Sequence, residues 1–143
     1  MAKKATIYTS KNCGYCTTIK EKFNEKEVKF TEKEISEHNG EWNEVSRLTG
    51  LPTTPTIEFN NNYYIPGRDF QNPDQIVDYI KDWDVKNESD QFNDVKLLEA
   101  FKTLTFTLNR SFGRLQQDLQ QLKQQEYIIT KTQINNQNPQ DVN

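Results

Sequence analysis

Cys13-Gly14-Tyr15-Cys16 stands at the start of the first predicted helix and contains the only two cysteines of a 143-residue chain. A Cys-x-x-Cys pair at a helix N-terminus places both sulfur atoms on one face of the first turn, close enough to bridge with little backbone movement. Unpaired backbone N–H groups and the positive end of the helix dipole favour the thiolate of the first cysteine. We therefore predict thiol–disulfide redox chemistry, with Cys13 as the nucleophile and Cys16 as the resolving thiol.

Other uses of two cysteines fit the sequence less well. A structural zinc site needs about four ligands, and two cysteines with one distant histidine, His38, do not supply them from one chain. Two inert buried thiols or a purely structural bridge stay as alternatives, but neither requires a helix start. A histidine beside Asn39-Gly40 is typical of an exposed loop and not of a catalytic base.

The composition favours one small packed domain with a solvated appendage. Hydrophobic residues make up 33% of the chain and the mean hydropathy is −0.97, whereas the regular apolar segments lie within residues 5–83. The net charge of −3 argues against a general affinity for nucleic acid or anionic membranes. No apolar run approaches the length of a membrane span or a signal peptide. We expect a cytoplasmic protein, where a Cys-x-x-Cys pair is more often catalytic than structural.

Residues 5–83 alternate between strand and helix patterns. Residues 5–9 are β-rich and lead to the cysteines, after which apolar residues recur at helical spacing to about residue 26. A second strand over 28–35 completes a β-α-β unit, whose strands should be parallel. The remaining predicted elements are a helix over 41–49 that ends at Gly50, a hairpin of two short strands around 60–62, and a helix over 73–83 that Asn72 caps.

Four features carry a family resemblance: the run Ile7-Tyr8-Thr9-Ser10-Lys11-Asn12-Cys13-Gly14-Tyr15-Cys16, the helix stop at Gly50, Thr53-Thr54-Pro55 opening the third strand, and Pro66-Gly67-Arg68-Asp69 after the fourth. On these features residues 5–83 resemble a dithiol glutaredoxin. The resemblance implies an α/β domain of the thioredoxin-like fold, over residues 1–84, and a glutathione-dependent thiol–disulfide oxidoreductase with glutathione as co-substrate. No metal is expected, and an iron–sulfur cluster held between two subunits, as in some family members, is a minor alternative.

The resemblance also implies a groove that binds glutathione beside the two cysteines. Pro55 would follow a cis peptide bond and face the cysteine pair, and Thr54 would pair through its main chain with the cysteine part of glutathione. Tyr15 would flank the ligand. Lys11 would pair with the glycine carboxylate of glutathione and support the thiolate.

The far end of this groove is implied at Gly67-Arg68-Asp69, which matches the segment that holds the γ-glutamyl end of glutathione in the family. Gly67 allows close approach of the backbone to the ligand, Asp69 offers a charge-assisted bond to its ammonium group, and Arg68 adds a carboxylate contact. Four positions depart from the usual residues of the family: Ser10 replaces a lysine, Gly14 a proline, Leu51 an arginine or lysine, and Pro66 a glycine.

The remaining sequence predicts a polar linker over 85–93, a long helix over 94–126 and a disordered tail over 127–143. Leucine and phenylalanine residues of the helix are spaced by 4, 3, 4, 4, 3, 4 and 3 from Leu97 to Leu122, which indicates a coiled-coil stripe with one four-residue stutter. A lone helix cannot bury such a stripe. The helix either forms a homo-oligomer, which we favour, or folds back on the first domain, and a marginal helix that serves only as a tether stays a third alternative.

Two function classes follow. In the first, the protein reduces protein disulfides or glutathione mixed disulfides, so that its partners are glutathione and disulfide-containing proteins. Family members donate electrons to enzymes such as ribonucleotide reductase, and small variants occur in bacteriophages, in which case the protein would act in the host cytoplasm. In the second, it is an interaction or structural protein of a larger assembly, organised by the C-terminal helix, with a secondary redox domain.

Overall fold

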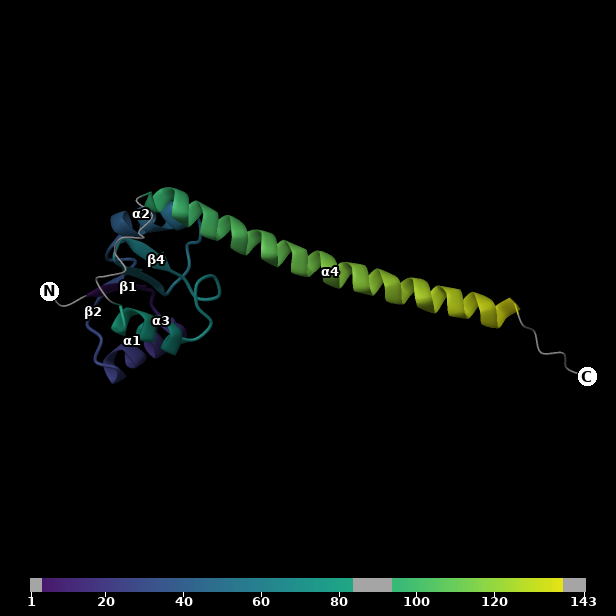
Figure 1. Cartoon of the computed structure of the whole chain (residues 1–143), viewed down its shortest axis with the longest axis horizontal. Coiled ribbons are helices and arrows are strands. Elements are labelled where there is room, and N and C mark those ends of the chain that lie inside the picture. Colours follow the sequence, from purple (N-terminus) through teal and green to yellow (C-terminus); the bar gives the residue numbers. More distant parts are fainter. Residues whose placement is uncertain (1–3, 84–93, 138–143) are drawn as a thin grey trace, which may run out of the picture. The chain divides into compact units, whose positions relative to one another are not determined.

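The computed structural model of the protein describes residues 4–83 and 94–137. Within these residues the order of elements is β-α-β-α-β-β-α, followed by one further helix (Figure 1). The first seven elements confirm the predicted order. Their bounds, with that of the last helix, are β1 Ala5–Thr9, α1 Gly14–Glu25, β2 Phe30–Glu34, α2 Asn39–Thr49, β3 Thr56–Phe59, β4 Asn62–Tyr64, α3 Pro73–Lys81 and α4 Val95–Gln137.

The strands form one mixed sheet in the order β2-β1-β3-β4. β1 and β2 pair in parallel, as predicted from the helix between them, while β3 is antiparallel to both β1 and β4. β1 is therefore an inner strand with a neighbour on each side. Its last residue, Thr9, leads directly into the turn before α1, which fixes where the Cys-x-x-Cys pair emerges from the sheet.

The two faces of the sheet are covered by different helices because successive side chains of a strand point to opposite faces. On one face, Ile7 of β1 lies in a buried cluster with residues of α1 and α3. On the other face, the next residue, Tyr8, packs against Trp42 of α2, with ring centroids 5.8 Å apart. The larger cluster contains Ala5, Ile7, Ile19, Phe23, Ile57, Phe59, Phe70, Ile76, Val77 and Ile80.

Two predicted helix ends are confirmed by their capping geometry. α2 ends at Gly50, whose φ of 67° lies in the left-handed region that glycine tolerates best. α3 begins after Asn72, whose side chain accepts a hydrogen bond from the backbone N–H of Gln75, and Pro73 occupies the first helical position. Gly50 therefore fixes where α2 ends, and Asn72 fixes where α3 begins.

α4 begins close to its predicted start, where the Asp94 carboxylate accepts a hydrogen bond from the N–H of Leu97 at 3.1 Å. The helix continues to Gln137, past the predicted end at residue 126, because residues 127–137 contain neither glycine nor proline. The predicted linker over 85–93, and residues 138–143 of the predicted tail, lie outside the described residues. No helix in the described part of the chain is long and apolar enough to cross a membrane.

The chain divides into two compact units, Met1–Leu104 and Thr105–Asn143. The first unit contains the sheet, its three covering helices and the first turns of α4. The second contains the rest of α4. The first turns of α4 therefore belong to the same unit as the Cys-x-x-Cys pair, whereas the sequence alone predicted a domain that ends near residue 84.

Candidate functional site

The Cys-x-x-Cys pair lies at the N-terminus of α1, as predicted. Cys13 is the N-cap residue, with extended backbone angles, and its sulfur accepts a hydrogen bond from the backbone N–H of Cys16 at 3.2 Å. The two residues form a disulfide with Cα atoms 5.2 Å apart. Cys16 is 2% exposed while Cys13 is partly exposed, so that Cys13 is the sulfur that a substrate can reach.

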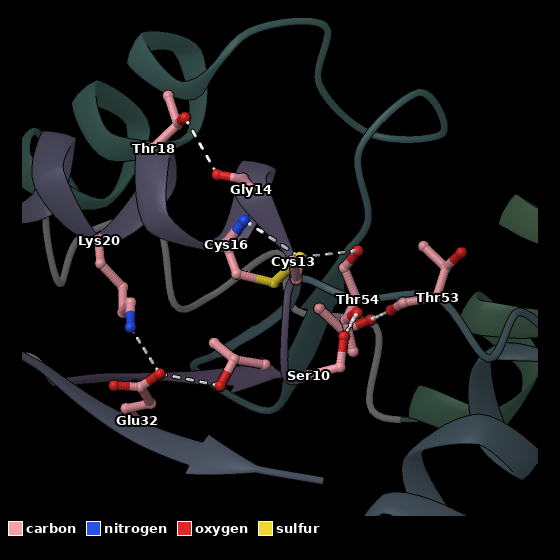
Figure 2. Close-up of a disulfide and its surroundings, with 11 residues drawn as sticks. Ser10, Cys13, Gly14, Cys16, Thr18, Lys20, Glu32, Thr53 and Thr54 are labelled. Atoms are coloured by element: carbon pink, nitrogen blue, oxygen red, sulfur yellow. Dashed lines mark hydrogen bonds and ion pairs between the residues drawn. A yellow bond between two sulfur atoms is a disulfide. The ribbon is translucent and has the colours of Figure 1, made fainter.

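The loop before β3 lies directly against this pair. The Thr54 carbonyl oxygen is 3.8 Å from Cys13 Sγ, and the Thr54–Pro55 peptide bond is cis, as the resemblance implied. Figure 2 shows Thr54 beside Ser10, and the hydroxyl groups of these two residues are hydrogen-bonded at 2.7 Å. Ser10, which replaces a family lysine, thus holds the turn before Cys13 against the loop before Pro55.

An open groove of about 470 Å³ borders the disulfide. In Figure 2, Lys20 and Glu32 lie on the opposite side of the disulfide from Thr54. Glu32 accepts hydrogen bonds from Lys20 Nζ at 2.7 Å and from the Thr9 hydroxyl at 2.9 Å. The bond from Lys20, more than that from Thr9, lowers the pKa of the Glu32 carboxyl despite the opposing effect of partial burial. The lining residues are Thr9, Ser10, Asn12, Cys13, Gly14, Cys16, Thr17, Lys20 and Glu32.

Tyr15, which lies between the two cysteines in sequence, and Lys11, two residues before Cys13, both remain on the surface. Tyr15 is 36% exposed, and its partial burial raises the pKa of its hydroxyl. Lys11 is exposed in the turn before Cys13. Hydrogen bonds from Ser36, with a smaller contribution from the charge of Lys11, lower the pKa of Glu34. The predicted roles of Tyr15 and Lys11 in binding glutathione stay predictions.

Gly67, Arg68 and Asp69 use their backbone N–H groups within their own turn. Gly67 donates to the Phe70 carbonyl oxygen at 2.8 Å, and Arg68 and Asp69 donate to the Ile65 carbonyl oxygen at 3.2 and 2.9 Å. Gly67 has a φ of 79°, and no atom lies within 4 Å of an added Cβ. The turn is therefore open at Gly67, while its donors already have partners in the structure.

The side chains of Arg68 and Asp69 take part in a buried ion network with α4. The Arg68 guanidinium is 1% exposed and lies 2.7 Å from carboxylate oxygens of both Asp69 and Glu99. Lys102 Nζ lies 2.9 Å from Glu99 Oε1 and 3.5 Å from Asp69 Oδ1. Glu99 itself is completely buried. A buried charge requires such partners, so this network fixes the first turns of α4 on the domain.

The contacts of the described residues bring one part of the predicted site together. Cys13, Cys16 and Thr54 lie together, whereas Arg68 and Asp69 pair with each other and with Glu99 and Lys102 of α4. The predicted roles of Gly67, Arg68 and Asp69 in binding glutathione stay predictions. The sequence alone did not predict the parts played by Ser10, Glu99 and Lys102. A search for i, i+3 charge pairs would have found Glu99 and Lys102, but such pairs are usually exposed to solvent. Among the described residues, no group of three His, Cys, Asp or Glu could hold a metal ion.

Comparison with known proteins agrees with this geometry. The family model of glutaredoxins matches residues 5–64, which extend from β1 to the end of β4. No curated protein gives a significant match to the chain. The match covers the strand that leads to the cysteines, α1 and the loop of Pro55, and it ends before Arg68.

Proposed function

We propose, from the premise that residues 5–64 form a domain of the glutaredoxin family, that this chain is a glutathione-dependent thiol–disulfide oxidoreductase. It reduces protein disulfides and glutathione mixed disulfides. Cys13 is the nucleophile and Cys16 the resolving thiol. The family and the Cys-x-x-Cys pair support thiol–disulfide exchange, and the dependence on glutathione is the finer part of the proposal.

The position of Cys13 as the N-cap of α1 carries this proposal. Its sulfur accepts the N–H of Cys16 and faces the first turn of a twelve-residue helix. A negative charge on that sulfur is stabilised by the N–H group and by the positive end of the helix dipole. Because Cys16 is 2% exposed, an incoming disulfide meets Cys13 first.

The reaction then proceeds by two thiol–disulfide exchanges. The Cys13 thiolate attacks the glutathione sulfur of a mixed disulfide, forms a Cys13–glutathione disulfide and releases the substrate as a thiolate, which takes up a proton from water. A second glutathione thiolate attacks the glutathione sulfur on Cys13, releases oxidised glutathione and restores the Cys13 thiolate. With a protein disulfide, Cys16 attacks the mixed disulfide at Cys13 and releases the reduced protein, which leaves the Cys13–Cys16 disulfide for two glutathione molecules to reduce.

Glutathione would bind along the loop of Thr54, whose carbonyl oxygen already faces Cys13. Tyr15 would flank it and Lys11 would meet its glycine carboxylate. The γ-glutamyl end has fewer free partners, because the backbone donors of Gly67, Arg68 and Asp69 are hydrogen-bonded within their turn. Binding there requires those groups to exchange partners, so we propose a weaker contact at the γ-glutamyl end than at the cysteine.

Two matched cysteine variants test the assignment of roles. In an assay coupled to glutathione, Cys13→Ser should abolish reduction of both a glutathione mixed disulfide and a protein disulfide, since the attacking sulfur is lost. Cys16→Ser should retain reduction of the mixed disulfide but lose at least about tenfold in rate on the protein disulfide, because the resolving thiol is absent. Equal losses for the two variants in both assays would contradict the assignment.

The choice of reductant tests the finer claim separately. The wild-type chain should reduce a protein disulfide with glutathione as the sole source of electrons, and the rate should rise with glutathione concentration until it saturates. Dithiothreitol is the control, because it reduces the Cys13–Cys16 disulfide without a binding site. Turnover with dithiothreitol but not with glutathione would retain thiol–disulfide exchange and refute glutathione dependence.

A further inference from the structure

α4 carries an apolar stripe that is exposed to solvent along most of its length. Every side chain of the stripe is between 48% and 66% exposed. Long helices gain most of their stability in water by packing an apolar face, and contiguous exposed apolar surface of this extent marks an interaction site. The stripe consists of Leu97, Phe101, Leu104, Leu108, Phe112, Leu115, Leu119 and Leu122.

The chain's own domain does not cover the start of this stripe, because α4 attaches to the domain by the side opposite the stripe. Glu99 pairs with Arg68, and Lys102 donates to the carbonyl oxygen of Tyr63 at 2.7 Å. Thr103 donates to the carbonyl oxygen of Thr49. At about 100° per residue, these side chains point to the opposite side of the helix from the stripe. The contacts that hold α4 therefore leave its apolar side free for another molecule.

We propose that a second copy of this chain covers the stripe, so that two α4 helices pair in parallel as a two-stranded coiled coil over residues 97–122. The spacing places stripe residues alternately at the a and d positions of heptads, with one stutter between Leu108 and Phe112. Phe101, Leu108, Phe112 and Leu119 occupy the a positions. Leu97, Leu104, Leu115 and Leu122 occupy the d positions.

The same assignment places the domain on the outside of the pair. Glu99 falls at an f position, Lys102 at b and Thr103 at c, which are the three positions that face away from the partner helix in a coiled coil. The residues that hold α4 on its domain are therefore not those that would meet a second helix. Docking on the domain and pairing between copies use different sides of α4 and are compatible.

The charges beside the stripe favour the parallel orientation. Asp118 falls at a g position and Lys123 at the following e position, five residues later. In a parallel pair, g of one helix faces the following e of the other, so two copies form two Asp118–Lys123 ion pairs. Within a single helix, residues five apart do not meet. An antiparallel pair would instead bring g against g and e against e.

The stripe is large enough for a stable pair. Specific protein interfaces bury roughly 1,200–2,000 Å² in total, and sixteen Leu and Phe side chains that each lose about 80–100 Å² supply that area. The a and d positions of the stripe contain no charged residue. A second copy of the chain presents the same eight apolar residues at the same spacing, so its stripe fits this one without any further requirement. An unrelated protein would need its own apolar surface with a matching spacing.

Sedimentation equilibrium on the full chain tests the pairing. The wild-type chain should have the mass of two chains, and Leu115→Asp with Leu119→Asp should have the mass of one, with lower helix content by far-UV circular dichroism. Gln117→Asp with Gln124→Asp, which adds the same charge outside the stripe, should retain the mass of two chains. The near-UV signal of the buried Trp42 should be the same in all three and shows that the first unit stays folded.

A monomeric wild-type chain, an assembly other than two chains, or a control that dissociates as the stripe variant does would overturn the proposal. Charge exchange tests the orientation. Asp118→Lys should weaken association at least about tenfold, and Asp118→Lys with Lys123→Asp should restore it, since the pair is rebuilt with opposite signs. Failure of the double variant to restore association would overturn the parallel arrangement.

Discussion

The reactive residues show how local geometry and distant packing contribute separately to one site. The position of Cys13 at the start of α1 follows from a spacing of three residues and a helix pattern, both visible in the sequence. The contact between Ser10 and Thr54 does not, because these residues are 44 positions apart. They meet only once β1 and β3 pair, which no local pattern specifies.

Glu32 and Lys20 provide a test at the scale of single residues, through the pH dependence of stability. The hydrogen bond from Lys20 lowers the pKa of Glu32 below its ordinary value of 4.5 in the folded protein. A carboxyl group whose pKa is lower in the folded protein than in the unfolded chain stabilises the fold at pH values above its unfolded pKa. This stabilisation is lost as the pH falls through the pKa of the folded protein. Lys20→Met should therefore lower the melting temperature at pH 7, and the difference from wild type should shrink as the pH falls below 4.5.

The measurement is a series of thermal unfolding curves at constant ionic strength. Lys29→Met serves as the control, because Lys29 is exposed while the hydrogen bonds that Glu32 accepts come from Lys20 and Thr9. Its melting temperature should stay close to that of wild type at every pH. A Lys20→Met deficit that is equally large below pH 4.5 would refute the ion pair as the source of the effect.

At the scale of elements, the sequence revealed the apolar side of α4 but not the side that binds the domain. The leucine and phenylalanine stripe was evident from its spacing, whereas Glu99 and Lys102 resembled an ordinary surface pair at i, i+3. Their partners Arg68 and Asp69 lie about thirty residues earlier, in a turn for which the family resemblance implied a ligand. Only the packed structure shows that the opposite charges of this turn come from α4.

Removal of the Glu99 carboxylate should therefore be costly. Glu99→Ala leaves Arg68, 1% exposed, without one of its two carboxylate partners, and breaking a buried ion pair in this way costs about 3–5 kcal/mol. Urea unfolding at a fixed chain concentration should show that the free energy of unfolding falls by about this amount. Glu126→Ala, an exposed glutamate of the same helix, should change the free energy of unfolding by less than about 0.5 kcal/mol. Similar small effects for both variants would show that the network does not hold α4 on the domain.

At the scale of the whole molecule, the family match and the compact unit have different limits. The match ends at residue 64, while the compact unit continues to Leu104 because α4 supplies the partners of Arg68. The sequence predicted the order of strands and helices, since caps and apolar spacing are local signals. The domain boundary at residue 84 stays a prediction, and the contacts of Glu99 and Lys102 with the rest of the first unit had no distinct sequence pattern.

Pairing of two chains through α4 would join two redox domains in one assembly. The cysteines of the two domains would take no part in this pairing. The groove beside Cys13 is lined by residues of β1, α1 and β2 and the turns between them, and none of its lining residues belongs to α4. We therefore expect the exchange reaction and the pairing to be separable, so that variants of the stripe change mass and variants of the cysteines change rate.

The central claim is that Cys13 is the reactive thiolate, and alkylation of the reduced full-length chain tests it most directly. Iodoacetamide is added in limiting amount at neutral pH, and the modified cysteine is located by mass spectrometry of the digested chain. Because its sulfur is the accessible one and faces the N–H groups of the first turn, Cys13 should be alkylated well before Cys16. Equal modification of the two cysteines, or earlier modification of Cys16, would contradict the account.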